Sequence, residues 1–481
     1  MKNNRANYCP QLSPGPQPIY RRLYEAFRDA ILSGQLTTGQ RVPSSRELAA
    51  RYGVGRITVT QAYEQLIAEG YLETRRGSGT FVTKLLPDGF LKAEGARRAL
   101  STDEETEIRS NLAPYIELPP FLSGCPDLEA FPIETWLKLY SRRLRGSPDS
   151  LNTYGHGEGG YLGLREAIAG HLRTHRGVRC SADQILIFNG SQPGLDLVAR
   201  ALVESGDRVA VEDPCFKGVA DAFRMSGAEV LPVPVDLEGM KVEELLAQKR
   251  SVRLVVATPA RQFPIGSAMP VGRQAVLLEW ARKKGAWILE DDYDSEFRFR
   301  GKPLPAMQGL AGYDRILYLG TFTRSMFPDV RIGYLVVPKH AYPDFLTLWK
   351  VGAMNPSISI QATLAEFIRQ GHYLRHVRKM RQLYAKRSHW LADKVLEMLG
   401  DWIELGPTDG GMHFVGFFKK PVDIRSLAKS GSEQGYAFRA LSSYAIETKG
   451  RDGLMFGFSS FSESKMLDAL TVLRGILSAS V

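Results

Sequence analysis

Apolar residues recur along this 481-residue chain in two different periods, and the change from one to the other divides it. Within residues 18–84 the spacing is mostly helical, beginning with Ile19, Leu23 and Phe27 on one face of a first helix. From about residue 116 to the end, short apolar runs alternate with helical patterns, as is typical of an α/β domain. The pattern therefore predicts a small, mainly helical domain followed by a large α/β domain at 116–481.

A helix-turn-helix is predicted between residues 44 and 70. Ser44 is a natural N-cap and Glu47, three residues on, completes a capping-box pattern. We therefore expect the first helix of this motif to begin after Ser44 and to run to about Tyr52. A short turn then leads to a second helix, expected over residues 56–69. Two helices joined by a tight turn, the second led by Arg and Thr side chains, form a motif that places a helix in a DNA groove.

The end of this small domain is predicted to be a β-hairpin. The segment YLETRRGSGTFV has apolar residues at both ends and Gly77-Ser78-Gly79 between them, which would form the tip of a wing. Residues 18–84 carry ten Lys and Arg against six Asp and Glu, a net charge of +4. This charge suits an acidic partner such as double-stranded DNA.

Six apolar runs of the α/β region read as buried strands, and the segments between them include two clear helical patterns. The predicted strands are ILIFN (185–189), RVAVE (208–212), RLVVAT (253–258), AWILED (286–291), ILYLGT (316–321) and IGYLVVP (332–338), and the predicted helices cover 192–205 and 271–284. From about residue 380 we expect a smaller α+β subdomain. Few apolar positions recur in residues 85–115, which we interpret as a linker, and residues 1–17 are expected to form a flexible tail.

Composition limits the remaining choices. The chain is 44% hydrophobic and 24% charged, which is ordinary for a globular protein, and its net charge is +10. No apolar run approaches the roughly 20 residues that span a bilayer, and the first 17 residues lack the apolar core of a signal peptide. Four cysteines without CxxC spacing argue against a disulfide framework or a zinc site. We therefore expect a cytoplasmic protein with no membrane partner and no metal.

The segments PSSRELA, AYEQLIAEGYL and RRGSGTFV resemble the winged helix-turn-helix of GntR-family repressors. The resemblance implies that this domain contacts double-stranded operator DNA through Ser45, Arg46, Arg56, Thr58, Thr60, Gly77 and Gly79. The alternative is that Arg46 and Arg56 are merely solvated surface charges.

Residues 116–481 resemble the fold-type I aminotransferase domain, a pyridoxal-phosphate-transferase-like α/β fold with a small α+β C-terminal subdomain, as it occurs in MocR/GabR-type regulators. The resemblance rests on FLSGCPDLEAFPIETW, YGHGEGGYLGLREAIAGHL, NGSQPGLDLVARAL, EDDYDSEFRF and LYLGTFTRSMFPDVRIGYLVVP. It implies a domain that binds a small effector and forms a head-to-tail homodimer. Together with the first domain, it implies a transcription regulator.

A cofactor pocket is implied by the same resemblance. The turn Gly190-Ser191-Gln192 lies between a strand and a helix, where free backbone N–H groups suit a phosphate. The family assigns Asp291 to the pyridine nitrogen of pyridoxal phosphate and Tyr293 to its phenolic oxygen, while Phe216 stands where a stacking Tyr is usual. The implied pocket residues are Ser191, Gln192, Phe216, Asp291, Tyr293, Thr321, Thr323, Arg324 and Arg331. The alternatives are that Asp291 caps a loop and that Phe216 belongs to the core.

Arg324 occupies the position of the lysine that forms the aldimine in this family. Aldimine formation needs a neutral amine, which a lysine in a suitable environment supplies, whereas the guanidinium of arginine stays protonated and is a poor nucleophile. Arg324 can instead bind an anion through its planar N–H groups. Lys217 is the nearest substitute in the sequence, and Arg261 and Ile265 alter two further family positions.

We therefore predict a regulator with a catalytically inactive aminotransferase-like domain. It would sense a small anionic or amino-acid-like effector and hold pyridoxal phosphate without a covalent bond, or hold none. A second hypothesis is an active aminotransferase with a DNA-binding appendage, which Arg324 argues against. A third is a pocket that has turned to an effector other than pyridoxal phosphate.

Overall fold

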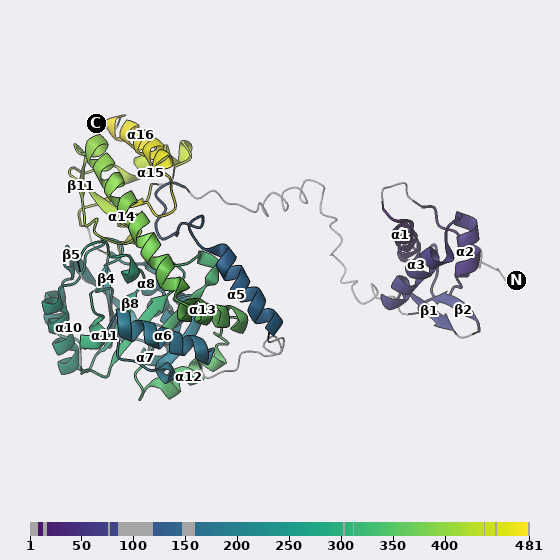
Figure 1. The fold of residues 1–481 in the computed structure, drawn as a ribbon, viewed down its shortest axis with the longest axis horizontal. Helices are drawn as coiled ribbons and strands as arrows, with labels where there is room; N and C mark the ends of the chain where they lie inside the picture. The colour runs from purple at the N-terminus through teal and green to yellow at the C-terminus, as the bar shows by residue number, and fades with distance from the viewer. Residues whose placement is uncertain are drawn as a thin grey trace. The chain divides into compact units, whose positions relative to one another are not determined.

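The computed structural model describes residues 8–12, 17–75, 77–84, 119–146, 159–301, 304–310, 312–436, 438–447 and 450–479. The chain divides into two compact units, Met1–Ile116 and Glu117–Val481 (Figure 1). The predicted linker, and the predicted tail apart from residues 8–12 and 17, lie outside the described residues.

The first unit is a winged helix-turn-helix, as predicted. Its elements are α1 (Ile19–Leu32), α2 (Ser45–Tyr52), α3 (Arg56–Ala68), β1 (Leu72–Arg75) and β2 (Gly79–Val82). Ser44 Oγ accepts a hydrogen bond from the Glu47 backbone N–H at 3.2 Å, whereas the Glu47 carboxylate pairs with Arg51 Nη2 at 3.3 Å. Gly53 ends α2 in the left-handed region, at φ +64°, which a residue with a side chain rarely adopts.

Residues 8–12 correct the prediction of a tail. Tyr8 packs edge-on against Phe27, with the ring centres 6.4 Å apart, and its hydroxyl donates to Gln35 Oε1 at 2.7 Å. The Tyr52 hydroxyl donates to the carbonyl of Pro10. Sequence pattern could not reveal this, because five residues are too few to show a period.

The second unit is built on an eight-stranded mixed sheet with the order β3-β10-β9-β8-β7-β4-β5-β6. Its strands are β3 (Ile185–Asn189), β4 (Arg208–Asp213), β5 (Glu229–Asp236), β6 (Gly239–Met240), β7 (Leu254–Ala257), β8 (Trp287–Asp292), β9 (Ile316–Thr321) and β10 (Ile332–Val336). Strands β9, β8, β7, β4 and β5 run parallel, and β10 runs antiparallel to both β3 and β9. The six predicted strands are present, whereas β5, with its two prolines, and β6 escaped the sequence pattern.

Helices cover both faces of this sheet (Figure 1). They are α5 (Ile133–Gly146), α6 (Leu162–His175), α7 (Gln192–Leu202), α8 (Lys217–Met225), α9 (Val242–Leu246), α10 (Val271–Lys284), α11 (Met307–Leu310), α12 (Tyr342–Val351) and α13 (Ile358–Arg369). Helices α7, α8 and α12 share one core cluster with the sheet, and α5, α6, α9, α10 and α13 pack against its other face. Burial on both faces explains why the strands read as continuous apolar runs.

A smaller subdomain completes the unit. It contains β11 (Ile403–Leu405), β12 (His413–Phe418), β13 (Gly453–Gly457), α14 (His372–Leu399), α15 (Ile424–Glu433) and α16 (Glu463–Ala479). Helix α14 joins the two parts: Val377 packs in the core of the large sheet and Met380 in the core of the small one. None of the described helices is both long enough and apolar enough to span a membrane.

Candidate functional site

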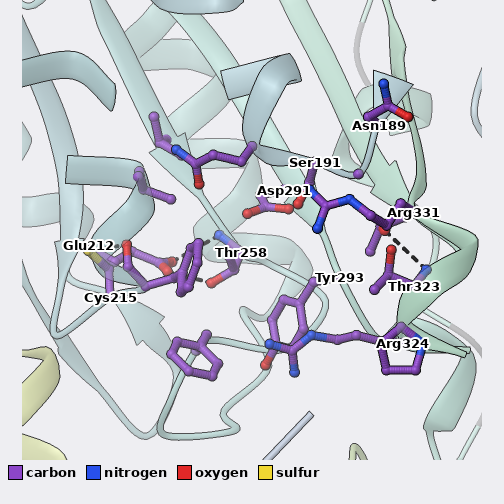
Figure 2. Close-up of a pocket in the computed structure, with 18 residues that line it drawn as sticks. Asn189, Ser191, Glu212, Cys215, Thr258, Asp291, Tyr293, Thr323, Arg324 and Arg331 are labelled. Carbon is purple, nitrogen blue, oxygen red and sulfur yellow. Dashed lines mark hydrogen bonds between the residues drawn. The ribbon is translucent and has the colours of Figure 1, made fainter. Parts of the chain in front are cut away.

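A cavity of about 270 Å³ opens at the carboxyl ends of the parallel strands, beside the N-terminus of α7 (Figure 2). All of the residues that we predicted for the cofactor pocket line it, namely Ser191, Gln192, Phe216, Asp291, Tyr293, Thr321, Thr323, Arg324 and Arg331. They come from segments as far apart as residues 191 and 331. The carboxyl ends of parallel strands meet at one edge of a sheet, and this brings the segments together.

The end of β8 places alternate side chains on opposite sides of the sheet. Asp291 and Tyr293 face the cavity. Glu290 and Asp292 face away, and Glu290 accepts hydrogen bonds from the backbone N–H groups of Met307 and Gln308 at 3.0 and 2.9 Å. This period of two is intrinsic to a strand, so holding Glu290 and Asp292 also directs Asp291 into the cavity.

Asp292 holds the end of β8 in place through several hydrogen bonds. Its Oδ2 accepts from Arg176 Nε at 2.9 Å, from the Tyr318 hydroxyl at 2.5 Å and from Ser295 Oγ at 2.8 Å. Both members of the Arg176–Asp292 ion pair are buried. A buried pair with this many hydrogen bonds holds the backbone rigidly, and Asp291 is its direct neighbour.

Asp291 is an acid whose carboxylate faces the cavity. Its carboxylate accepts none of the hydrogen bonds found among the described residues, which argues against the alternative that it caps a loop. Burial and the nearby Asp292 raise its pKa to about 7, although the Arg324 guanidinium opposes the shift. A carboxyl group that titrates near neutrality and faces a cavity suits a ligand that carries a proton, such as a pyridinium nitrogen.

The opposite side of the cavity presents hydrogen-bond donors. The Thr321 hydroxyl accepts from the Thr323 backbone N–H at 3.2 Å, which shapes the loop, and Thr323 Oγ1 has no partner among the described residues. Arg331 begins the return into β10 at φ +40°, a left-handed conformation that is uncommon for a residue with a side chain. Ser191 caps α7 without using its side chain. Hydroxyl, guanidinium and helix N-terminal N–H groups are the kinds of donor that suit an anion.

Arg324 lies along the Tyr293 ring, with its guanidinium carbon 4.8 Å from the ring centre and 5.7 Å from that of Phe263 (Figure 2). It also fits closely against Gly124, because a Cβ added there would lie 2.8 Å from Arg324 Nη1. That nitrogen is buried and has no hydrogen-bond partner among the described residues. Among the described residues no acidic side chain forms a direct ion pair with Arg324, although its charge acts on the nearby carboxyl groups of Asp291 and Asp294.

A further acid in the cavity, Glu212, was not predicted from the sequence. It accepts hydrogen bonds from the Thr258 backbone N–H at 3.1 Å, from the Thr258 hydroxyl and from Gln262 Nε2 at 3.2 Å. Burial raises its pKa to about 7. The signal was available, because Glu212 is the last residue of a predicted buried strand, as Asp291 is. Its hydrogen bonds show that it anchors the turn at 258–266.

Arg261, which alters a family position, is not among the residues that line the cavity. Its side chain runs behind the pocket, where Nη2 donates to the His413 carbonyl at 2.7 Å and Nε lies 3.7 Å from Asp294 Oδ2. A Cβ on Gly411 would lie only 2.2 Å from Arg261 Nε. Arg261 therefore connects the large sheet to the small subdomain.

Phe216 and Lys217 lie at the start of α8 with different surroundings. Phe216 is 44% exposed and lines the cavity, so the alternative that it belongs to the core is wrong. Lys217 is exposed and is not among the lining residues. Cys215, which also lines the cavity, is buried, and burial raises its pKa to about 12, so its thiol stays protonated.

In the first unit, the residues predicted to contact DNA lie on α2, on α3 and at the tip of the wing. Arg56 Nε donates to Ser45 Oγ at 3.3 Å, so the two helices present these side chains together. Gly79 lies at φ +109°, and a Cβ there would approach Arg41 Nε to 2.8 Å. Arg41 was not predicted, because it precedes the helix-turn-helix and reaches the wing only in three dimensions.

Comparisons with known families agree with this architecture. Residues 19–82 match the bacterial regulatory proteins of the gntR family, and residues 123–451 match aminotransferase class I and II. A probable rhizopine catabolism regulatory protein, MocR, of Rhizobium meliloti is 37% identical, covering 95% of this chain and 93% of its own. The pyridoxine biosynthesis transcriptional regulator PdxR of Corynebacterium glutamicum is 33% identical, covering 94% of each chain.

Solved structures similar to this chain are aminotransferases. Kynurenine aminotransferase of Pyrococcus horikoshii, solved in complex with PMP, gives a TM-score of 0.71 at 24% identity, covering 78% of this chain and 95% of its own. An alpha-aminoadipate aminotransferase of Thermus thermophilus gives 0.70 at 24% identity, covering 77% and 94%. At this identity the likeness concerns the fold.

Proposed function

Because the chain belongs to the MocR-type regulators of the GntR family, in which a DNA-binding domain precedes an aminotransferase class I and II domain, we propose that its cavity senses a small anion held without a covalent bond. The effector would be phosphorylated or amino-acid-like. Its occupancy would change how the first unit binds operator DNA in the cytoplasm.

Arg324 is the observation that carries this proposal. None of the described residues that line the cavity is a lysine, and Arg324 stands where the family resemblance places the amine. An unpaired guanidinium on an aromatic face cannot attack an aldehyde, but it attracts an anionic ligand strongly in a partly buried site. The pocket therefore supports binding and argues against covalent attachment.

The other lining residues fit pyridoxal phosphate, which the fold family implies. Ser191, Thr323 and Arg331 would hold its phosphate, and Asp291 would pair with its ring nitrogen. Thr323 Oγ1 and the Tyr293 hydroxyl are buried without partners among the described residues, so each has hydrogen-bonding capacity for a ligand. When bound, this group supplies an electron sink, and Asp291 would keep the ring nitrogen protonated.

We propose that the domain has no aminotransferase activity. Transamination needs a residue at this position that releases and accepts a proton, and a guanidinium does neither at neutral pH. Asp291 would face the ring nitrogen, and Lys217 is not among the described residues that line the cavity. The described lining residues can thus bind and orient a ligand, but Arg324 offers no base at the position where that step needs one.

We further propose a head-to-tail homodimer, which the resemblance to MocR/GabR-type regulators implies. In this arrangement the DNA-binding unit of one chain would lie against the sensor domain of its partner. Analytical ultracentrifugation of the full chain tests the assembly, because a monomer at micromolar concentration would contradict it.

A thermal-shift screen of the full chain tests the sensing proposal. A ligand that binds only the folded protein raises the melting temperature by mass action, by several degrees at 100 times its Kd. The probes are pyridoxal phosphate, pyridoxamine phosphate, inorganic phosphate and the amino acids. Any stabilising probe is then added to a gel shift with the protein's own promoter. If no probe stabilises the protein, or none changes DNA binding, the sensing proposal is wrong.

A further inference from the structure

Ile57 is an apolar side chain on the outside of the recognition helix. It occupies the second position of α3 and is 85% exposed, whereas Val59, Ala62 and Leu66 of the same helix are fully buried. Its face is therefore opposite to the one that packs in the core. The fold gains nothing from Ile57, because hydrophobic stabilisation requires that apolar area leave water.

The surroundings of Ile57 are those of a DNA-reading surface. Arg56 precedes it and is oriented by its hydrogen bond to Ser45. Thr60 lies three residues on and therefore on the same side of the helix, and its hydroxyl donates to the Arg56 carbonyl at 3.0 Å. The hydroxyl proton of Thr60 is thus used within the helix. Ile57 and Thr60 together form an apolar spot between charged and polar side chains.

We propose that Ile57 determines operator sequence by contacting the 5-methyl group of a thymine in the major groove. The inference rests on the DNA-binding role of this family. The first residues of a recognition helix contact base edges, and thymine is the base that presents a methyl group there. Ile57 has no donor or acceptor, so a cytosine N4 or adenine N6 amino group facing it would lose its hydrogen bonds to water. The contact thus favours thymine and disfavours its replacements.

The test uses the full chain and a DNA site selected by it from a random duplex pool. Each thymine of the selected site is replaced in turn by uracil, which removes only the methyl group, and Kd is measured by fluorescence anisotropy at fixed salt. In each half-site we expect one thymine whose replacement by uracil raises Kd about fourfold, because the contact then loses the burial of one methyl-sized group. With Ile57→Ala the thymine and uracil forms should bind equally at that position.

Two variants serve as controls. Met225→Ala removes an equally exposed apolar side chain, 88% accessible, from the second unit and should leave every Kd unchanged. Ile57→Val keeps a branched side chain and should retain most of the thymine preference. Because Ile57 is exposed, neither Ile57 variant should change the melting temperature.

The outcomes separate the inference from the function on which it rests. Selection of no sequence at all would contradict DNA reading by this unit. Selection followed by equal binding of every uracil-substituted site would overturn the role of Ile57 alone. A change in sedimentation of Ile57→Ala, with the thymine preference intact, would show instead that Ile57 contacts a second copy of the chain and would likewise overturn the inference.

Discussion

The guanidinium of Arg324 lies on the face of the Tyr293 ring, with 4.8 Å between its central carbon and the ring centre. The aromatic face stabilises the cation and fixes its position inside the cavity. The pocket thus holds a permanent positive charge. A guanidinium in this position favours anionic ligands and cannot act as a nucleophilic amine.

Arg324 predicts that no pyridoxyl adduct forms. Incubation with pyridoxal phosphate, reduction with borohydride and intact mass measurement should show the unmodified mass. Arg324→Lys should gain one adduct and an absorbance band of an internal aldimine, because residue 324 lines the cavity and the variant would place an amine there. Arg324→Gln is the matched control and should gain neither. An adduct on the wild-type protein would mean that another lysine performs the reaction.

The charge of Arg324 also predicts which ligand binds more weakly. The aminomethyl group of pyridoxamine phosphate is a cation, and two like charges about 4 Å apart in a partly buried site repel by more than 1 kcal/mol. Pyridoxamine phosphate should therefore bind about tenfold more weakly than pyridoxal phosphate, as measured by calorimetry. In Arg324→Gln the two affinities should converge. Equal affinities in the wild-type protein would place Arg324 away from that substituent.

Asp291 predicts a pH dependence of stability. Burial raises its pKa from 3.8 to about 7, so the folded state binds the proton more tightly than the unfolded state. Its contribution is then most favourable below about pH 4 and is lost as the pH rises through about 7. Asp291→Asn removes this loss, so the variant should gain stability relative to wild type on the order of 1 kcal/mol between pH 5.5 and 8.5. Thermal unfolding of the variant and of the wild-type protein at pH 5.5 and at pH 8.5 measures this difference in stability.

We expect substitution of Arg261 to lower the stability of the protein rather than to change ligand binding. Arg261→Ala would leave Asp294 buried without its cation, so we expect a destabilisation of about 3 kcal/mol. Burial already raises the pKa of Asp294 to about 6, and the loss of Arg261 should raise it further. The damage should therefore be smaller at pH 5.5, where Asp294 accepts a proton. Arg298→Ala, which removes a more exposed pairing with Asp409, is the control in urea unfolding.

We expect the side chain of Arg56 to contribute to the affinity for DNA. Arg56→Ala should weaken binding to the promoter by about 1–3 kcal/mol if the side chain reaches a base edge. Ser45→Ala should cost less, because it removes only the hydrogen bond that orients Arg56. Arg21→Ala removes an exposed arginine of α1, paired with Glu25, and is the matched control in a gel-shift titration. Unchanged affinity of Arg56→Ala at several salt concentrations would show that Arg56 is a solvated surface charge.

The sequence by itself determined the features that depend on neighbours along the chain. The capping pattern at Ser44 fixed where α2 begins, and the buried strands appeared as apolar runs because both faces of the sheet are covered. Asp291 and Thr321 were assigned to one site by the family resemblance of their segments, and the structure brings them together because both lie at the carboxyl ends of parallel strands. Arg324 could be interpreted chemically from its residue type alone.

Only the tertiary structure decided where the long side chains point. Arg261 passes behind the cavity because Gly411, 150 residues later in the chain, leaves room for its guanidinium. Arg324 rests on Tyr293 and against Gly124, and Phe216 is exposed to the cavity rather than buried. Local pattern sets backbone conformation, but the direction of a flexible side chain depends on the space and charge offered by residues that are distant in sequence.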